Sequence, residues 1–165
     1  MKKLIILLLC SWRITVCVAQ QLPTPGIAQI PVPGLGDICI ATMDQGGNPI
    51  ICYNPQLMQQ VGTAAAYFFI AHEYGHHKLG HIVLGAISAN NPYLQAWLTM
   101  NMENQADAFA VDYWISRGDK RPIQAGCNTF MAINNPGDQT HPPSALRAQN
   151  VAQYFAQRTG MPLFP

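Results

Sequence analysis

The stretch IAHEYGHHKLGH, residues 70–81, constrains the fold more than any other, because it places four histidines and one glutamate inside an apolar, alanine-rich segment. From Gln56 to about residue 86 the pattern predicts helix, which begins after Asn54-Pro55 and has a bend near Gly62. Any chemistry carried by these polar side chains must therefore follow the geometry of a helix face.

Within this stretch His72, Glu73 and His76 form the pattern H-E-x-x-H. Residues four apart share a helix face, so both imidazoles can reach one ion. Glu73 leans over the edge of that face, toward the place of a metal-bound water. Zinc suits imidazole nitrogen and has no redox chemistry, so the pattern predicts a catalytic zinc site, one Zn²⁺ for each chain.

The other two histidines of the stretch are not expected to bind the ion. His77 points about 100° away from His76, and His81 lies about 180° from His72 around an ideal helix. A zinc site with three histidines would need a histidine at position 82, where the chain has Ile82. We therefore expect the third protein ligand to come from another segment.

The chain contains two glutamates, Glu73 and Glu103, and Glu103 is followed four residues later by Asp107. A glutamate ligand with an aspartate one helical turn on is a sound arrangement, since the aspartate can accept a hydrogen bond from a ligating imidazole. The alternative is a solvated acidic helix face. The same face carries apolar residues that favour burial: Trp97, Met100, Val111 and Trp114. A buried carboxylate pair needs a cation, which favours the metal-site interpretation.

Length and composition predict one globular domain, since the chain has 165 residues, 49% of them hydrophobic and 10% charged. The formal charge of +1 argues against nucleic acid as the main partner. Residues 1–19 are typical of a secretory signal peptide, with Lys2 and Lys3 before an apolar run and small residues at the end. We expect export to the periplasm or the extracellular space and no stable membrane span after cleavage; the alternative is an anchor that is never removed.

After this leader, residues 20–36 predict a Pro/Gly-rich arm without regular structure, and residues 37–165 the single metallopeptidase domain. Two β-branched runs flank the turn-prone DQGGN and predict a hairpin, 38–42 with 49–53. With the turn centred between Gln45 and Gly46, Cys39 falls opposite Cys52, and a disulfide is geometrically feasible. Two buried free thiols are the alternative.

Further helices are expected from about Pro92 to Gly118, over 122–133 and over 144–157. The fold class predicted is therefore α+β, mostly α: a zincin-like helical domain with a small N-terminal β-hairpin.

Three segments together carry a resemblance: AHEYGHHKLGH, then ENQADAFA, then THPPSALR. Their motifs and order are similar to those of the HtpX-like/CAAX prenyl protease family of gluzincin metallopeptidases, over roughly residues 50–157. The resemblance implies zinc held by His72, His76 and Glu103, Glu73 as catalytic base and Asp107 behind the ligands. His141 and Arg147 match the third motif, whose residues lie near the cleft. The chain lacks the multiple membrane spans of those enzymes, so their membrane-protein or prenylated substrates are not carried over.

The function predicted is a secreted or periplasmic zinc endopeptidase acting on a peptide or protein substrate, with His141 as candidate donor to the oxyanion. The alternative is a non-catalytic module in which zinc only staples three helices. Glu73 favours the enzyme, because a purely structural site needs no general base. In a third interpretation the protein is a zymogen, and the Pro-rich arm covers the cleft.

Overall fold

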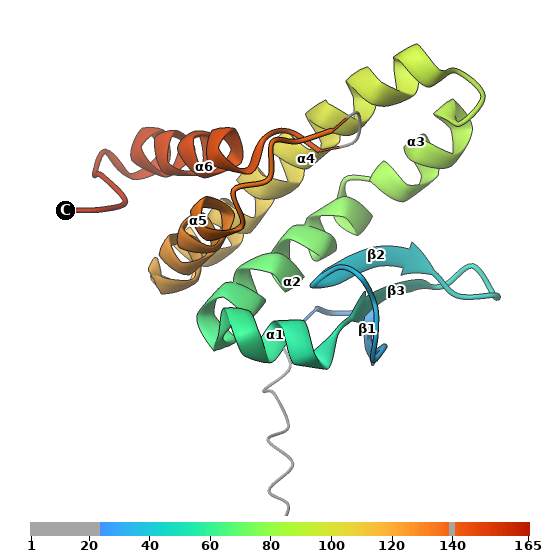
Figure 1. Ribbon diagram of the computed structural model, residues 1–165, viewed down its shortest axis with the longest axis horizontal. Coiled ribbons are helices and arrows are strands. Elements are labelled where there is room, and N and C mark those ends of the chain that lie inside the picture. The colour runs from blue at the N-terminus through green and yellow to red at the C-terminus, as the bar shows by residue number, and fades with distance from the viewer. Residues whose placement is uncertain (1–23, 139–140) are drawn as a thin grey trace, which may run out of the picture.

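The computed structural model describes residues 24–138 and 141–165, so the predicted signal peptide, 1–19, lies outside the described residues. The described part of the chain forms three strands and six helices (Figure 1). In chain order they are β1 (Ala28–Pro31), β2 (Cys39–Met43), β3 (Pro49–Tyr53), α1 (Pro55–Val61), α2 (Thr63–Lys78), α3 (His81–Ser88), α4 (Pro92–Ile115), α5 (Arg121–Ile133) and α6 (Ser144–Thr159). The prediction of a mostly helical α+β domain is confirmed.

The strands form one small sheet in the order β1-β3-β2. The predicted hairpin is β2 and β3, which pair antiparallel. Its turn is held by Asp44, whose Oδ1 accepts hydrogen bonds from the backbone N–H groups of Gly46 and Asn48, both at 2.8 Å. The N-terminal arm was predicted to be irregular, and this is wrong for residues 28–31, which pair with β3 in parallel. Strand β1 pairs with the side of β3 that β2 leaves open, and it satisfies the backbone N–H and C=O groups on that side. No local sequence pattern predicts this pairing.

The hairpin register corrects the cysteine prediction. Ile40 lies opposite Cys52, and Cys39 lies opposite Tyr53, so the two cysteines are one position out of register. Because side chains alternate along a strand, the two thiols point to opposite faces of the sheet. Both cysteines are free, so the possible Cys39–Cys52 disulfide is not formed and the alternative of two free thiols holds. The cause is the turn, which is centred on Gly46 and shifts the pairing by one residue.

Helix α2 lies at the centre of the fold, between the sheet on one side and α4 and α5 on the other (Figure 1). Its Phe68 and Phe69 pack edge to face against Phe130 of α5. Two glycines allow this close packing. A Cβ atom on Gly126 would lie 2.5 Å from the Phe68 ring, and one on Gly75 would lie 3.0 Å from Phe109 of α4. Helix α2, which carries the H-E-x-x-H pattern, is therefore held by close packing against α4 and α5.

Two breaks interrupt the long helix that the sequence predicts between 56 and 86. The first is at Gly62, as expected, where φ is 82°. The second was not predicted: α2 ends at Lys78, Gly80 adopts the left-handed conformation with φ of 73°, and α3 begins at His81. Because of this second break, side-chain directions after position 80 do not follow from one straight helix.

Helix α4 differs from the prediction in its first half. Trp97 was expected to be buried, yet it is 65% exposed, whereas Val111 and Trp114 are buried. The first turns of α4 extend with α3 beyond the rest of the molecule (Figure 1), which agrees with the high exposure of Trp97. No helix among the described residues has both the length and the apolarity needed to cross a membrane.

Candidate metal centre

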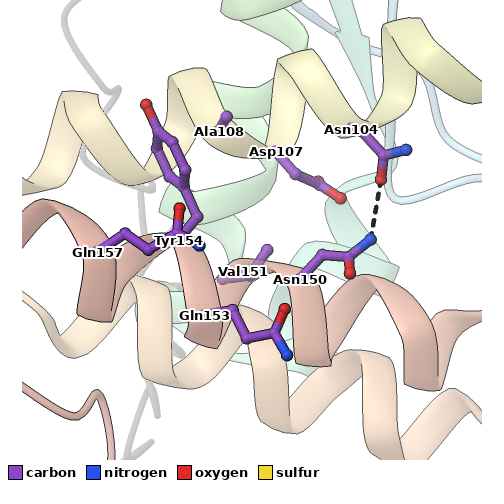
Figure 2. A pocket seen from close by; sticks show the side chains of 8 residues that line it. All are labelled: Asn104, Asp107, Ala108, Asn150, Val151, Gln153, Tyr154 and Gln157. Carbon is purple, nitrogen blue, oxygen red and sulfur yellow. Dashed lines mark hydrogen bonds between the residues drawn. The ribbon is translucent and has the colours of Figure 1, made fainter.

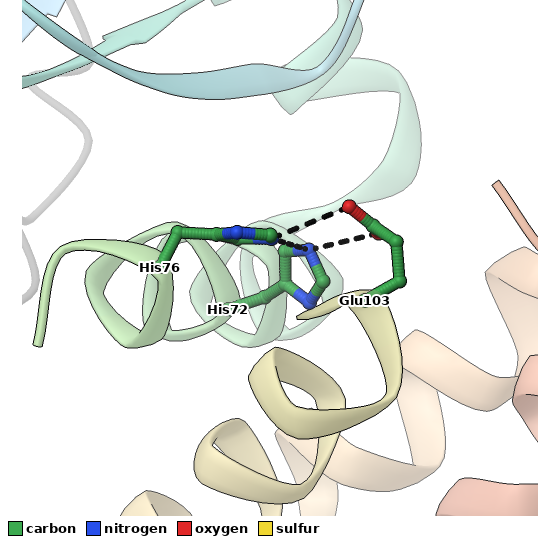
Figure 3. Close-up of side chains that lie close together, drawn as sticks. All are labelled: His72, His76 and Glu103. Carbon is green, nitrogen blue, oxygen red and sulfur yellow. Dashed lines mark hydrogen bonds and ion pairs between the residues drawn. The ribbon is translucent and has the colours of Figure 1, made fainter. Parts of the chain in front are cut away.

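Three predicted ligands meet at one point between α2 and α4 (Figure 3). The Nε2 atoms of His72 and His76 are 3.0 Å apart, and each lies 3.4 Å from an oxygen of Glu103. One ligand atom from each residue lies within 4.8 Å of the other two. The side chains are 5%, 12% and 8% exposed, respectively. The structure thus brings together the two histidines of one helix and a glutamate 27 residues after the second of them.

His72 is oriented by a carboxylate on its far side. Its Nδ1 lies 2.9 Å from Oδ1 of Asp107, one turn after Glu103 on α4. A carboxylate can only accept, so Nδ1 carries a proton, and Nε2 is the nitrogen that faces the cluster. Asp107 thus lies on the far side of His72, as the resemblance implied, and its role in supporting a ligand stays a prediction.

Arg147 of α6 holds the two carboxylates of α4. Its guanidinium donates to both oxygens of Asp107, at 2.8 and 2.7 Å, and its Nη1 lies 3.1 Å from Oε2 of Glu103. The same guanidinium lies 4.4 Å from the ring centre of Phe130. Arg147 is buried, so this ion pair joins α6 to the cluster.

The charges of the cluster suit a cation. Burial alone would lower the pKa of His72, but hydrogen bonds to Asp107 and Glu103 outweigh it and raise that pKa to about 10. Burial opposes the ionisation of Glu103, yet the hydrogen bonds of His72 and His76 hold the pKa of Glu103 well below its usual range. Without a metal, the carboxylates of Asp107 and Glu103 therefore keep His72 in its protonated, positively charged form. A divalent cation can replace that proton, and two imidazole nitrogens with one carboxylate are a donor set typical of zinc.

Glu73 lies beside the ligands and is held by the sheet. The backbone N–H of Ala41 in β2 donates to Oε2 of Glu73 at 2.7 Å, and the thiol of Cys39 lies 4.0 Å from Oε1. Burial raises the pKa of Glu73 to about 7. A carboxylate with this pKa can take up and release a proton near neutral pH, as a general base must.

His141 is the predicted residue that the structure places least clearly at the site. It lies in the loop before α6, its side chain is 53% exposed, and its Nδ1 is 3.6 Å from Oδ1 of Asp138. Its backbone N–H also donates to Asp138. The role of His141 as a donor to the oxyanion stays a prediction.

The two remaining histidines of the stretch have defined partners. His77 bonds to the backbone carbonyl of Ile50 in β3 at 2.8 Å, so it joins α2 to the sheet. His81 is buried, with its Nδ1 3.2 Å from Nδ1 of His76 and its Nε2 3.0 Å from Oε1 of Gln105. The half-turn separation predicted for His81 assumed one straight helix and is wrong. The signal that could have shown this is Gly80, a residue type favoured just past a helix end.

A shallow hollow of about 230 Å³ lies between α4 and α6 (Figure 2). Asp107 contributes to its wall, but none of the three metal ligands does. Its other polar groups are largely neutral amides, and Asn150 donates to Asn104 across it at 3.2 Å. Since both oxygens of Asp107 are already bonded to Arg147 and His72, this hollow lies behind the metal centre and offers no ligand to it.

Comparison with known protein families gives one match. The family model described as Peptidase U49 matches residues 50–160, from β3 to the end of α6. No curated protein and no solved structure matches the chain. The matched region includes the three predicted ligands, Glu73, Asp107 and Arg147. The chain belongs to the Peptidase U49 family.

Proposed function

We propose that this member of a peptidase family is a zinc-dependent endopeptidase. His72, His76 and Glu103 hold the ion, and Glu73 is the general base. The observation that carries the proposal is the buried convergence of two imidazole nitrogens and a carboxylate, with a base of raised pKa beside them. The motif order, similar to that of the HtpX-like/CAAX prenyl protease enzymes, supports the same function.

Three protein ligands support a catalytic rather than a structural ion. Structural zinc sites are closed by four protein ligands, whereas catalytic sites keep one position for water or substrate. Among the described residues, the group that can hold a metal has three members. The zinc-stapled, non-catalytic module remains the competing function, and the position of Glu73 argues against it, since a staple gains nothing from a buried carboxylate with a pKa near 7.

The chemistry divides between the ion and the chain. When bound, zinc supplies Lewis acidity, which polarises a carbonyl and makes water nucleophilic near neutral pH. Glu73 accepts the proton of the attacking water at one carboxylate oxygen and later delivers it to the leaving nitrogen. The N–H of Ala41 holds the other oxygen, so the carboxylate keeps its orientation through both steps.

Strand β2 is suited to bind an extended substrate next to Glu73. It is one of the two edge strands of the described sheet, and Ala41 directs its N–H away from β3 and toward the catalytic base. In an antiparallel pair the N–H and C=O of one residue point the same way, so the carbonyl of Ala41 also faces outward. A peptide that adds to this edge would donate a main-chain hydrogen bond to the carbonyl of Ala41, while the N–H of Ala41 stays bonded to Glu73.

Export is part of the proposal and rests on residues 1–19. Lys2 and Lys3 precede an apolar run and small residues, the pattern of a secretory signal. A periplasmic or extracellular peptidase would meet peptide or protein substrates there, with no need for a nucleic-acid partner.

The experiment compares purified parent protein with Glu73→Gln. We expect one zinc per chain in both proteins, measured by elemental analysis, and cleavage of a broad peptide library by the parent alone. His77→Gln is the matched control, because its side-chain amide can still donate to the carbonyl of Ile50, and it should cleave like the parent. A parent that holds zinc and cleaves nothing would favour the stapled module. Full activity of Glu73→Gln would refute the mechanism.

A further inference from the structure

We propose that His81, itself oriented by Gln105, sets the tautomer of His76 and so directs the Nε2 lone pair of His76 at the metal. His81 would then be a positioning residue for one of the two histidine ligands. The proposal deepens the proposed function, because it rests on a metal held by His76.

The geometry begins with the break in the helix. Helix α2 ends at Lys78, and the left-handed Gly80 turns the chain so that His81 starts α3. The turn brings His81 back against His76, with ring centres 5.0 Å apart and ring planes at 77°. Nδ1 of His81 is then 3.2 Å from Nδ1 of His76, and its other nitrogen is 3.0 Å from Oε1 of Gln105. His81 is 5% exposed, so both contacts are buried from solvent.

The protons follow from the partners. The carbonyl oxygen of Gln105 can only accept, so Nε2 of His81 carries a proton and Nδ1 of His81 is an acceptor. That acceptor takes the proton on Nδ1 of His76. Nε2 of His76 is left with a free lone pair on the side that faces Glu103 and His72. The opposite order would put a proton on Nε2 of His76, where it would block metal binding.

The two ligand histidines are thus supported in parallel ways. Asp107 accepts the Nδ1 proton of His72, and His81 accepts the Nδ1 proton of His76. Ligating imidazoles usually give their second nitrogen to such an acceptor, which fixes both the tautomer and the ring orientation. Among the described residues, Nδ1 of His76 has no other polar contact. Without His81, the proton on that nitrogen would therefore have no fixed acceptor.

His81 does not itself bind the ion. It meets His76 at Nδ1, on the ring edge opposite the one that faces Glu103. The group of described residues able to hold one metal contains His72, His76 and Glu103, without His81. The contact therefore supports a ligand and adds none.

The test uses two variants that differ in one property. In His81→Asn the side-chain oxygen can stand near the place of Nδ1 and accept from His76. In His81→Phe the ring is kept and the acceptor is lost. Zinc affinity is measured by chelator competition, and the tautomer of His76 in the metal-free protein by long-range ¹H–¹⁵N NMR. His77→Phe is the control, because it removes the histidine next to His76 on α2 and leaves the contact between His81 and His76 in place.

We expect His81→Phe to bind zinc about 10- to 100-fold more weakly than the parent. His81→Asn should recover most of that loss, and His77→Phe should show none of it. In the parent, the NMR should show His76 protonated on Nδ1, with the Nε2 tautomer gaining population in His81→Phe. Equal zinc affinity in folded parent and His81→Phe would overturn the proposal, as would an Nε2-protonated His76 in the parent. If the parent bound no zinc at all, the proposed function would fall, and the His76 tautomer would still decide the positioning role by itself.

Discussion

Replacement of Arg147 by methionine tests how the charges of the metal centre are balanced. Arg147 donates twice to Asp107 and lies 3.1 Å from Glu103, and its side chain is 10% exposed. Removing one partner of a buried ion pair costs about 3–5 kcal/mol, because the remaining charge is left without compensation. We expect the free energy of unfolding of the metal-free protein to fall by this amount.

The zinc-loaded protein should lose less. Without metal, the two carboxylates are balanced by Arg147 and by a proton on His72, whose pKa is raised to about 10. The variant then carries one buried negative charge in excess. With zinc bound and both imidazoles neutral, the ion, Arg147, Glu103 and Asp107 together carry one positive charge in excess, and loss of Arg147 leaves that group balanced. Zinc should therefore recover on the order of half of the lost stability.

The assay is urea unfolding of the parent and Arg147→Met, with chelator and with saturating zinc. Two controls separate charge from packing. Arg147→Lys keeps the charge but loses the two-pronged contact with Asp107, so its loss should be similar in both forms. Arg158→Met breaks the half-exposed pair with Asp112 and should change stability little. An equal loss for Arg147→Met with and without zinc would refute the charge argument.

Three further predictions concern the base, the edge strand and the core. Burial raises the pKa of Glu73 from its ordinary 4.5 to about 7. The ionisation of Glu73 therefore costs no folding stability below about pH 4.5, an increasing amount between pH 4.5 and 7, and a constant amount above pH 7. In urea unfolding, metal-free Glu73→Gln should therefore gain stability over the parent as pH rises through that window, by at most about 3 kcal/mol. Ala41→Pro removes the N–H that lowers the pKa of Glu73, so the acid limb of the kcat/KM profile should move to higher pH by about 0.7 unit, equivalent to about 1 kcal/mol; an unmoved limb would show that the Ala41 contact is absent in solution. Gly126→Ala places a Cβ 2.5 Å from the Phe68 ring and should lower the thermal unfolding temperature through a loss of about 1–3 kcal/mol, whereas Gly85→Ala, with open space around it, should not.

The sequence predicted best what depends on residues four apart in one helix. His72 and His76 on α2, and Glu103 and Asp107 on α4, share faces whatever the rest of the chain does, and the structure brings both pairs together. The start of α1 was equally local, since Asn54 caps the helix through its own side chain. These features follow from helix geometry and capping chemistry alone.

What the sequence did not predict depends on distant segments or on a shift of one residue. The parallel pairing of β1 with β3 joins residues 22 positions apart and has no local signal. One residue of difference in the hairpin turn reversed the face of Cys39 relative to Cys52. Trp97 is exposed because the α3 and α4 ends extend past the core, and helical periodicity gives the face of a residue but not the length of its neighbour.

The unpredicted helix break at Gly80 changes the role expected for His81. On a straight helix, His81 would point away from His72 and would be an ordinary polar residue facing solvent. With α2 ending at Lys78, His81 instead stands behind His76, as Asp107 stands behind His72. The H-E-x-x-H pattern supplies the two proposed histidine ligands, but an imidazole binds metal only in one tautomer. In our proposal each of these imidazoles takes its tautomer from a residue outside the pattern. One support comes from α4 and the other from α3, so the fold around α2 determines whether the pattern can bind an ion.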